Sequence, residues 1–247
     1  AGQPPDPATG AVAVPIVLAA TFAQSAPGEH QGFTYTRTNN PNRAQLEASV
    51  AALEGGQYGF AFASGSAATA TVLQTLAPGQ RVVATADLYG GTYRLLEQRM
   101  RPLGVDVVFV DVDIHAAVEE ALATPTAMLW LESPTNPLLK VADIRALSAL
   151  AHARGTRVVV DNTFATPMLQ RPLALGADVV LHSTTKFING HSDVLGGVVV
   201  TSDAALAQQL HQFHADMAQA LHGNAELADF LVAELALDRG HQCLQRT

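Results

Sequence analysis

The chain has 247 residues and a formal net charge of −8 at pH 7, and 48% of its residues are hydrophobic while 15% are charged. This balance excludes a disordered chain, and the negative charge argues against a nucleic acid partner, because phosphate binding needs clustered Lys and Arg. The apolar runs are far shorter than the roughly 20 residues of a membrane helix, so no membrane partner is expected. The single cysteine, Cys243, permits no internal disulfide and predicts a cytoplasmic location.

Three segments of different character follow one another along the chain. Residues 1–45 are rich in Pro, Gly, Asn and Thr and are predicted to form an extended arm. From about Gln57, β-branched runs alternate with amphipathic stretches, which predicts an α/β fold with a mostly parallel sheet. The expected strands are 58–63, 81–84, 105–110, 127–131, 156–160, 178–181 and 197–201. The expected helices are 67–76, 92–101, 114–122, 144–154 and 204–235.

Chemically suggestive residues follow three of these strands, at the edge where parallel sheets bind ligands. A run of small residues, 64–68, opens a helix and suits a phosphate, although tight helix packing explains it equally well. Asp161 ends a buried strand, where an ionised carboxylate is unfavourable unless a cation or several donors pair with it. The alternative to such a functional carboxylate is an ordinary Asp in a turn or at a helix N-cap. Lys186, flanked by hydroxyls, could be an imine-forming nucleophile or an exposed loop lysine.

The combination is more informative than any one of these residues. A lysine, a buried carboxylate and a phosphate cradle are what pyridoxal phosphate requires. The chain lacks a Walker lysine and a G-x-G-x-x-G sequence, which disfavours a nucleoside triphosphate or a dinucleotide. The helical pair His211 and His214 is more typical of a solvated face than of a metal site, so no metal is expected.

Six stretches in order resemble the trans-sulfuration (Cys/Met metabolism) family of fold-type-I pyridoxal-phosphate enzymes: FTYTRTNNPNR, FASGSAA, DLYGGT, ESPTNP, VVVDNTFATP and HSTTKFINGHSD. The resemblance implies a mostly parallel seven-stranded sheet with helices on both faces. It also implies an N-terminal arm (1–45) that reaches a neighbouring subunit and a cofactor domain (46–205). Residues 206–247 are then a linker helix and the remnant of an incomplete C-terminal domain.

The resemblance also assigns roles to individual positions. Lys186 matches the Schiff-base lysine and Tyr89 the tyrosine that stacks on the cofactor ring, and both are implied to be catalytic. Asp161 matches the partner of the pyridine nitrogen. The remaining matches bind the cofactor, and two of them, Tyr35 and Arg37, reach the phosphate of a neighbouring subunit. The other cofactor residues are Gly65, Ser66 (usually Met in the family), Asn136, Ser183 and Thr185.

The amino-acid sequences of these motifs most resemble those of bacterial cystathionine γ-lyases. This similarity implies α,γ-elimination of L-cystathionine to cysteine, 2-oxobutanoate and ammonia by a homo-oligomer, a dimer of dimers with shared sites. Cystathionine γ-synthase and methionine γ-lyase are the alternatives within the family. A truncated, catalytically silent scaffold is the non-enzyme alternative, because the family's C-terminal arginine for the substrate carboxylate is not recognisable in this sequence.

Overall fold

The computed structural model describes the backbone of residues 2–220 and the side chains of residues 2–213. Its centre is a seven-stranded sheet in the order β3-β9-β8-β7-β6-β4-β5. The edge strand β3 and strand β8 both pair antiparallel with β9, and all other pairs are parallel. The strands are β3 (Tyr58–Phe62), β4 (Arg81–Thr85), β5 (Asp106–Val110), β6 (Met128–Glu132), β7 (Arg157–Asp161), β8 (Val179–Ser183) and β9 (Gly197–Thr201). The predicted mostly parallel sheet is therefore confirmed.

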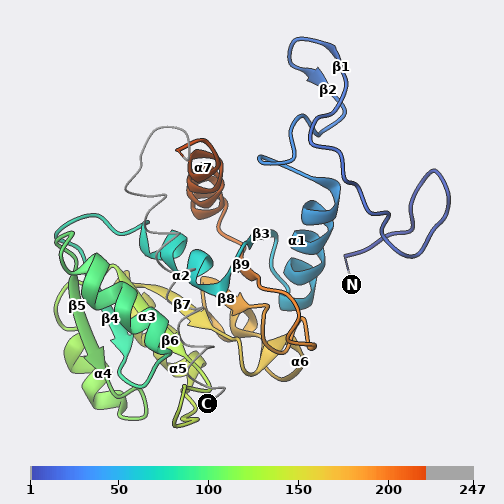
Figure 1. Cartoon of the computed structure of the whole chain (residues 1–247). Coiled ribbons are helices and arrows are strands. Elements are labelled where there is room, and N and C mark those ends of the chain that lie inside the picture. The colour runs from blue at the N-terminus through green and yellow to red at the C-terminus, as the bar shows by residue number, and fades with distance from the viewer. Residues whose placement is uncertain (1, 221–247) are drawn as a thin grey trace, which may run out of the picture.

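The central strands lie where their sequences predict because they are buried on both faces. Every residue of β6 and β9 is buried, as expected for continuous apolar runs covered by helices on each side. Trp130 of β6 packs on the face that α2 (Gly65–Leu73) covers, whereas Leu131 packs against α5 (Ile144–His152) on the other. Figure 1 shows α1 and α2 on opposite sides of β3 and β9. Helices on both faces are thus confirmed.

Local signals fix the ends of the helices. Helix α1 (Pro41–Glu54) starts after Asn40, whose side chain accepts the N–H of Asn42, and it ends at Gly55 with a φ of 76°. The helix expected at 92–101 is divided into α3 (Gly90–Leu95) and a π-helical turn (Leu96–Met100). The other helical segments are α4 (His115–Ala121), α6 (Thr166–Leu169), a 3₁₀ turn (Pro172–Leu175) and α7 (Ala204–Ala220).

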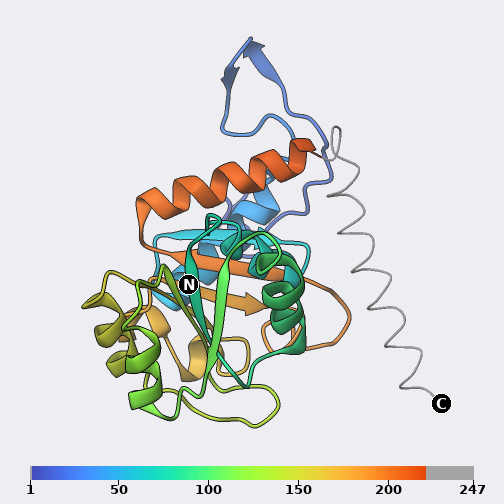
Figure 2. The ribbon, with the colours of Figure 1, turned by 90° about the vertical axis from the view of Figure 1, so that its left-hand side faces the viewer.

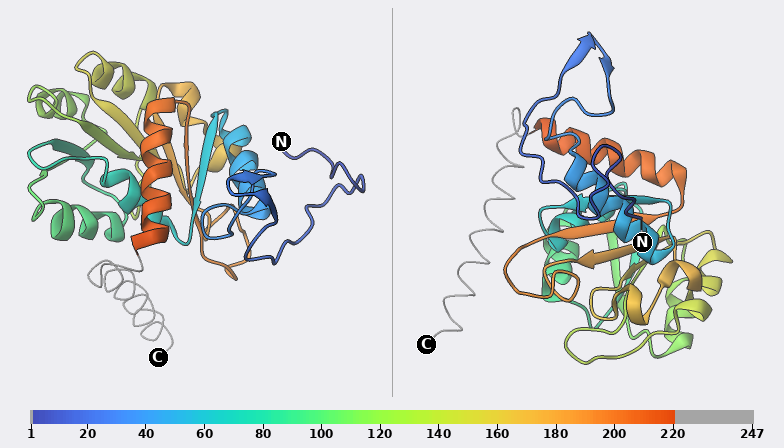
Figure 3. Two further views of the ribbon diagram at one scale, coloured as in Figure 1. Left: turned by 90° about the horizontal axis from the view of Figure 1, so that it is seen from above. Right: turned by 90° about the vertical axis from the view of Figure 1, so that its right-hand side faces the viewer.

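The N-terminal arm is extended, but it is shorter than predicted. It carries a small hairpin, β1 (Gln24–Ala26) and β2 (Glu29–His30), and it projects beyond α1 away from the sheet (Figures 1 and 3). Its apolar side chains Ile16 and Leu18 are 83% and 91% exposed. The prediction of an arm up to residue 45 is wrong at its end, because Asn40 and Pro41 are a cap and a first-turn proline that start α1.

Helix α7 lies over β3 and β9, beside α2 (Figure 2). It begins near the predicted end of the cofactor domain, although the division into domains stays a prediction. The expected continuation of this helix to residue 235 lies outside the described residues, as do Cys243 and the side chain of His214. Within residues 2–220, no helix is both long and apolar enough to cross a membrane.

Candidate active site

A cavity of about 230 Å³ lies at the carboxyl ends of β6, β7 and β8. It is the place where a parallel sheet is expected to bind a ligand. Eight of the residues predicted to contact a cofactor line it: Gly65, Ser66, Tyr89, Asn136, Asp161, Ser183, Thr185 and Lys186. The structure therefore brings together residues that are far apart in the sequence, while their individual roles stay predictions.

The start of α2 forms one end of this cavity. Ser64 caps the helix by accepting the N–H of Ala67 at 3.1 Å, and the first N–H groups of a helix have no partner within it. A Cβ atom at Gly65 would lie 2.7 Å from the Cβ of Ser183, so only glycine lets the helix approach β8 so closely. The same end contains Ser66 and Thr185, whose hydroxyl is hydrogen-bonded to the backbone of Gly196. The free N–H groups of a helix start, together with these hydroxyls, are chemically suited to a phosphate-sized anion.

Asp161 is the acidic group at the other end, and only 8% of it is exposed. Its Oδ1 accepts the backbone N–H and the hydroxyl of Thr163 at 3.0 and 2.5 Å. Within the described residues no donor reaches Oδ2. Burial raises the pKa of Asp161, while the Thr163 hydrogen bonds and the charge of His182 lower it. A cation placed beside Oδ2 would therefore be bound strongly.

Glu132 is a second buried carboxyl group in the cavity, and it was not predicted from the sequence. It ends β6 directly beside Asp161 on β7, and 5% of it is exposed. Burial first, and then the charge of Asp161, raise its pKa to about 8. Its Oε2 accepts the backbone N–H of Tyr89 at 2.8 Å. The available signal was its position at the end of a buried strand, the same signal that identified Asp161.

Tyr89 and Lys186 approach the cavity from two loops. Tyr89 precedes α3 and is 42% exposed, and its ring lies so close to Gly91 that a Cβ there would be 2.3 Å from it. Lys186 follows β8 in a turn and is exposed. It lines both this cavity and an adjoining one of about 630 Å³ that also contains Asp193. An aromatic face and an accessible amine thus lie at the same opening.

Tyr35 and Arg37 do not line this cavity. They lie on the N-terminal arm, where the guanidinium of Arg37 stacks over the ring of Tyr35 at 4.9 Å. Tyr35 is also bridged to Thr21 of the arm. In a single chain these two residues are therefore separated from the others predicted to bind the cofactor, and their role across a subunit boundary stays a prediction.

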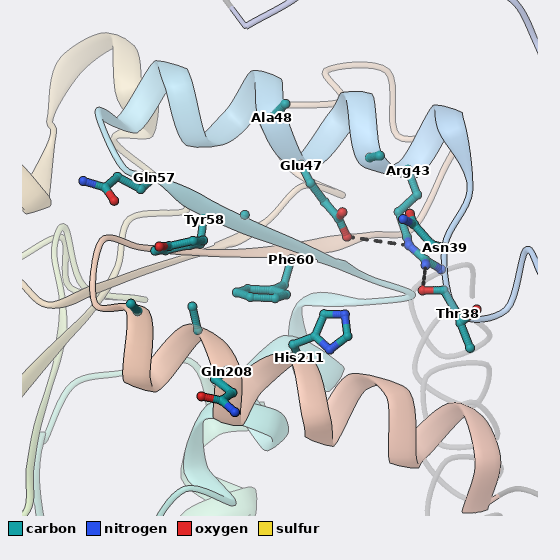
Figure 4. Close-up of a pocket in the computed structure, with 14 residues that line it drawn as sticks. Thr38, Asn39, Arg43, Glu47, Ala48, Gln57, Tyr58, Phe60, Gln208 and His211 are labelled. Carbon is teal, nitrogen blue, oxygen red and sulfur yellow. Dashed lines mark hydrogen bonds and ion pairs between the residues drawn. The ribbon is translucent and has the colours of Figure 1, made fainter. Parts of the chain in front are cut away.

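A different cavity of about 520 Å³ lies between α1, β3 and α7 (Figure 4). Arg43 and Glu47 of α1 face each other across its rim at 3.6 Å, and Arg43 also donates to the carbonyl of Thr38. Phe60 and His211 point into it from the sheet and from α7. None of the predicted site residues lines this cavity, so the cavity beside Lys186 is the candidate active site.

An α/β fold with a lysine, a buried carboxylate and a phosphate cradle at one sheet edge defines a class of protein built to hold a charged aromatic cofactor. A family model described as "Cys/Met metabolism PLP-dependent enzyme" matches residues 1–228. The chain belongs to this family of pyridoxal-phosphate (PLP) enzymes.

Individual relatives catalyse different reactions. The cystathionine beta-lyase of Coxiella burnetii is 54% identical over 212 residues, covering 85% of this chain and 55% of the relative. The cystathionine gamma-synthase of Mycobacterium leprae is 52% identical, with 84% and 54% covered. The crystal structure of cystathionine gamma-lyase from Lactobacillus plantarum complexed with L-serine has a TM-score of 0.84 at 46% identity, covering 88% and 57%. The chain thus spans about half the length of the relatives it matches.

The residues of the cavity fit PLP, the cofactor that the family implies. The free oxygen of Asp161 suits a protonated ring nitrogen, and the start of α2 suits the phosphate. Lys186 provides the amine, and Tyr89 an aromatic face for a flat ring. These residues would hold the cofactor.

Replacing Gly65 with alanine tests the phosphate cradle. The new Cβ would force α2 away from Ser183, and overpacking of this kind costs about 1–3 kcal/mol. We expect PLP affinity to fall by about tenfold or more in an absorbance titration. Gly90→Ala is the matched control, because it starts α3 beside the same cavity and its Cβ would meet only the end of Arg94, at 3.6 Å. Equal affinities for both variants would contradict the cradle.

Proposed function

We propose that this chain binds PLP in the cavity at the ends of β6, β7 and β8 and catalyses α,γ-elimination of L-cystathionine. The products are cysteine, 2-oxobutanoate and ammonia, with one water consumed. The observation that carries the proposal is the convergence of Lys186, Asp161 and the start of α2 on one cavity. When bound, the cofactor ring accepts the electron pair of the broken Cα–H bond.

The residues of the chain have separate roles in this proposal. The Lys186 amine removes the proton from the substrate Cα, would pass that proton on to the bound cofactor, and then, as a free amine again, removes one from Cβ. The Tyr89 hydroxyl donates a proton to the departing sulfur. The Asp161 carboxylate would keep the proton on the ring nitrogen, and Asn136 would contact the ring hydroxyl. Ser183 and Thr185, with the N–H groups of Gly65 and Ser66, bind the phosphate.

The arm supports a proposal about assembly. It holds Tyr35 and Arg37 apart from the cavity of their own chain, and it exposes Ile16 and Leu18 to solvent. Arginine is suited to bidentate phosphate binding. We propose that the arm completes the phosphate site of a neighbouring copy within a homotetramer.

A second candidate reaction is α,β-elimination, which the 54% identity to a cystathionine beta-lyase favours. It would give homocysteine, pyruvate and ammonia from the same substrate. Synthesis of cystathionine from cysteine and an activated homoserine is the third, because a gamma-synthase is 52% identical.

Product analysis distinguishes these reactions. The chain is incubated with PLP and L-cystathionine, and the thiols and oxo acids are separated. We expect cysteine and 2-oxobutanoate in equal amounts. Homocysteine with pyruvate would instead establish α,β-elimination, and cystathionine formed from cysteine and an O-acylated homoserine would establish γ-replacement. If the chain does not bind PLP even at a saturating concentration, it is a catalytically silent scaffold and not an enzyme.

A further inference from the structure

A buried polar cluster lies behind the candidate active site, on the opposite face of the sheet. Leu181 and Ser183 of β8 line the cavity, so the side chain of His182 between them points to the other face. There its Nε2 lies 2.5 Å from Oε1 of Glu54, the last residue of α1. Neither side chain has any exposed surface.

Two amides extend this pair across the neighbouring strands. Asn162 donates from Nδ2 to the same Glu54 oxygen at 3.0 Å. Gln170 donates from Nε2 to Oδ1 of Asn162 at 2.8 Å and to the carbonyl of Ser133 at 2.9 Å. The cluster of Glu54, His182, Asn162 and Gln170 therefore connects α1 to the ends of three strands.

Each strand-end member of the network is next in sequence to a residue of the cavity. Ser133 follows Glu132 at the end of β6, and Asn162 follows Asp161 at the end of β7. His182 precedes Ser183 at the end of β8. A shift of any of these backbone positions on the far face would move its neighbour in the cavity.

The network is poorly suited to a role in stability alone. Replacing a buried ion pair by apolar groups of similar volume is often neutral or stabilising. In addition, Oε2 of Glu54 and Nδ1 of His182 are buried and have no hydrogen-bond partner among the residues that the structure describes. Unpaired buried polar atoms of this kind lower stability. We propose that Glu54 and His182 are positioning residues of the cofactor site, which fix the strand ends beside the cavity and interact electrostatically with the buried Asp161.

Titratable groups lie on both sides of the Glu54–His182 pair. Glu54 of α1 faces His182 from one side. The titratable groups that line the cavity side are Glu132 of β6, Asp161 of β7, Lys186 after β8 and Tyr89 before α3. The positive charge of His182 lowers the pKa of Asp161. An ionised Asp161 is what the ring nitrogen of PLP requires, so this inference rests on the proposed function.

The experiment measures PLP affinity against pH for the whole chain. Glu54→Gln keeps the size and a hydrogen-bonding oxygen but replaces the carboxylate that faces Nε2 of His182. We expect it to bind PLP about tenfold more weakly at pH 6, and the acid midpoint of PLP binding to rise by about one pH unit. The loss of affinity is expected to be smaller at pH 9, because a higher pH itself favours the ionised form of Asp161.

Two further variants keep the test decisive. Thr156→Val removes a buried hydrogen bond to the carbonyl of Thr126 at the far end of β7, so it lowers stability without touching the network. Its acid midpoint is expected to equal that of the wild type. The double variant Glu54→Leu with His182→Leu keeps an apolar, packed site and is expected to fold while showing the raised midpoint.

The outcomes separate this inference from the proposed function. A wild type that fails to bind PLP overturns the proposed function and this inference with it. A wild type that binds PLP, with unchanged midpoints in Glu54→Gln and in the double variant, overturns the positioning role alone. Equal shifts in Thr156→Val would also overturn it, since the effect would then reflect stability rather than position or charge.

Discussion

Replacing Lys186 with alanine is expected to lower the turnover of cystathionine by about 10⁴-fold or more. The sequence contains two lysines, Lys140 and Lys186, and only Lys186 lines the candidate active site. In the proposed mechanism the Lys186 amine both attaches PLP covalently and transfers the protons at Cα and Cβ. The absorption band of protein-bound PLP should also disappear, and borohydride should no longer fix the cofactor to the protein.

Lys140→Ala is the matched control for this prediction. The amine of Lys140 is paired with Asp111 at 2.6 Å and with Asp113 at 3.3 Å. We expect this variant to keep the absorption band and the turnover of the wild type. Peptide mapping after borohydride reduction should place PLP on Lys186. Attachment at Lys140, or turnover that survives in Lys186→Ala, would exclude the assigned role.

The second large effect is on stability as a function of pH. The folded protein raises the pKa of Glu132 to about 8, whereas an exposed glutamate has a pKa of about 4.3. Between these values the folded state holds a proton that the unfolded chain releases. The stabilisation is therefore complete below about pH 4 and is lost as the pH rises to about 8.

Glu132→Gln removes this titration. The free energy of unfolding of the variant should therefore exceed that of the wild type by an amount that grows with pH. We expect the cofactor-free variant to be more stable at pH 9 than the wild type by a few kcal/mol, and by less at pH 6. Urea unfolding at the two values measures the difference. Glu97→Gln is the control, because Glu97 is paired with Arg101 and its pKa is lowered, out of this range. Parallel pH dependences for Glu132→Gln and the wild type would refute the raised pKa.

The sheet could be predicted from sequence because its strands are apolar on both faces. The run Val158–Val160 has no helical period, and Asp161 directly after it marks the carboxyl end of the strand. Lys186 could be found in the same way, since it follows β8. These signals depend only on residues next to one another in the chain, so they can be recognised in a single sequence.

Other features depend on contacts that no local pattern records. Glu132 becomes part of the site because β6 and β7 pair in a register that places it beside Asp161. Glu54 and His182 are separated by 128 positions in the chain, and only the packing of α1 on the sheet brings them together. Helix α1 was not predicted, because the Asn- and Pro-rich sequence at its start is also typical of an extended segment.

The strand order has a consequence for synthesis of the chain. In the described sheet β3 has one neighbour, β9, and β9 starts at Gly197, long after β3 has ended at Phe62. At ribosomal rates of about 5–20 residues per second, β3 waits roughly ten seconds for its partner strand. During that time Phe60 and the apolar face of α1 have no completed sheet to pack against. The nascent chain is therefore most prone to aggregate through β3 until β9, the last strand of the described sheet, pairs with it.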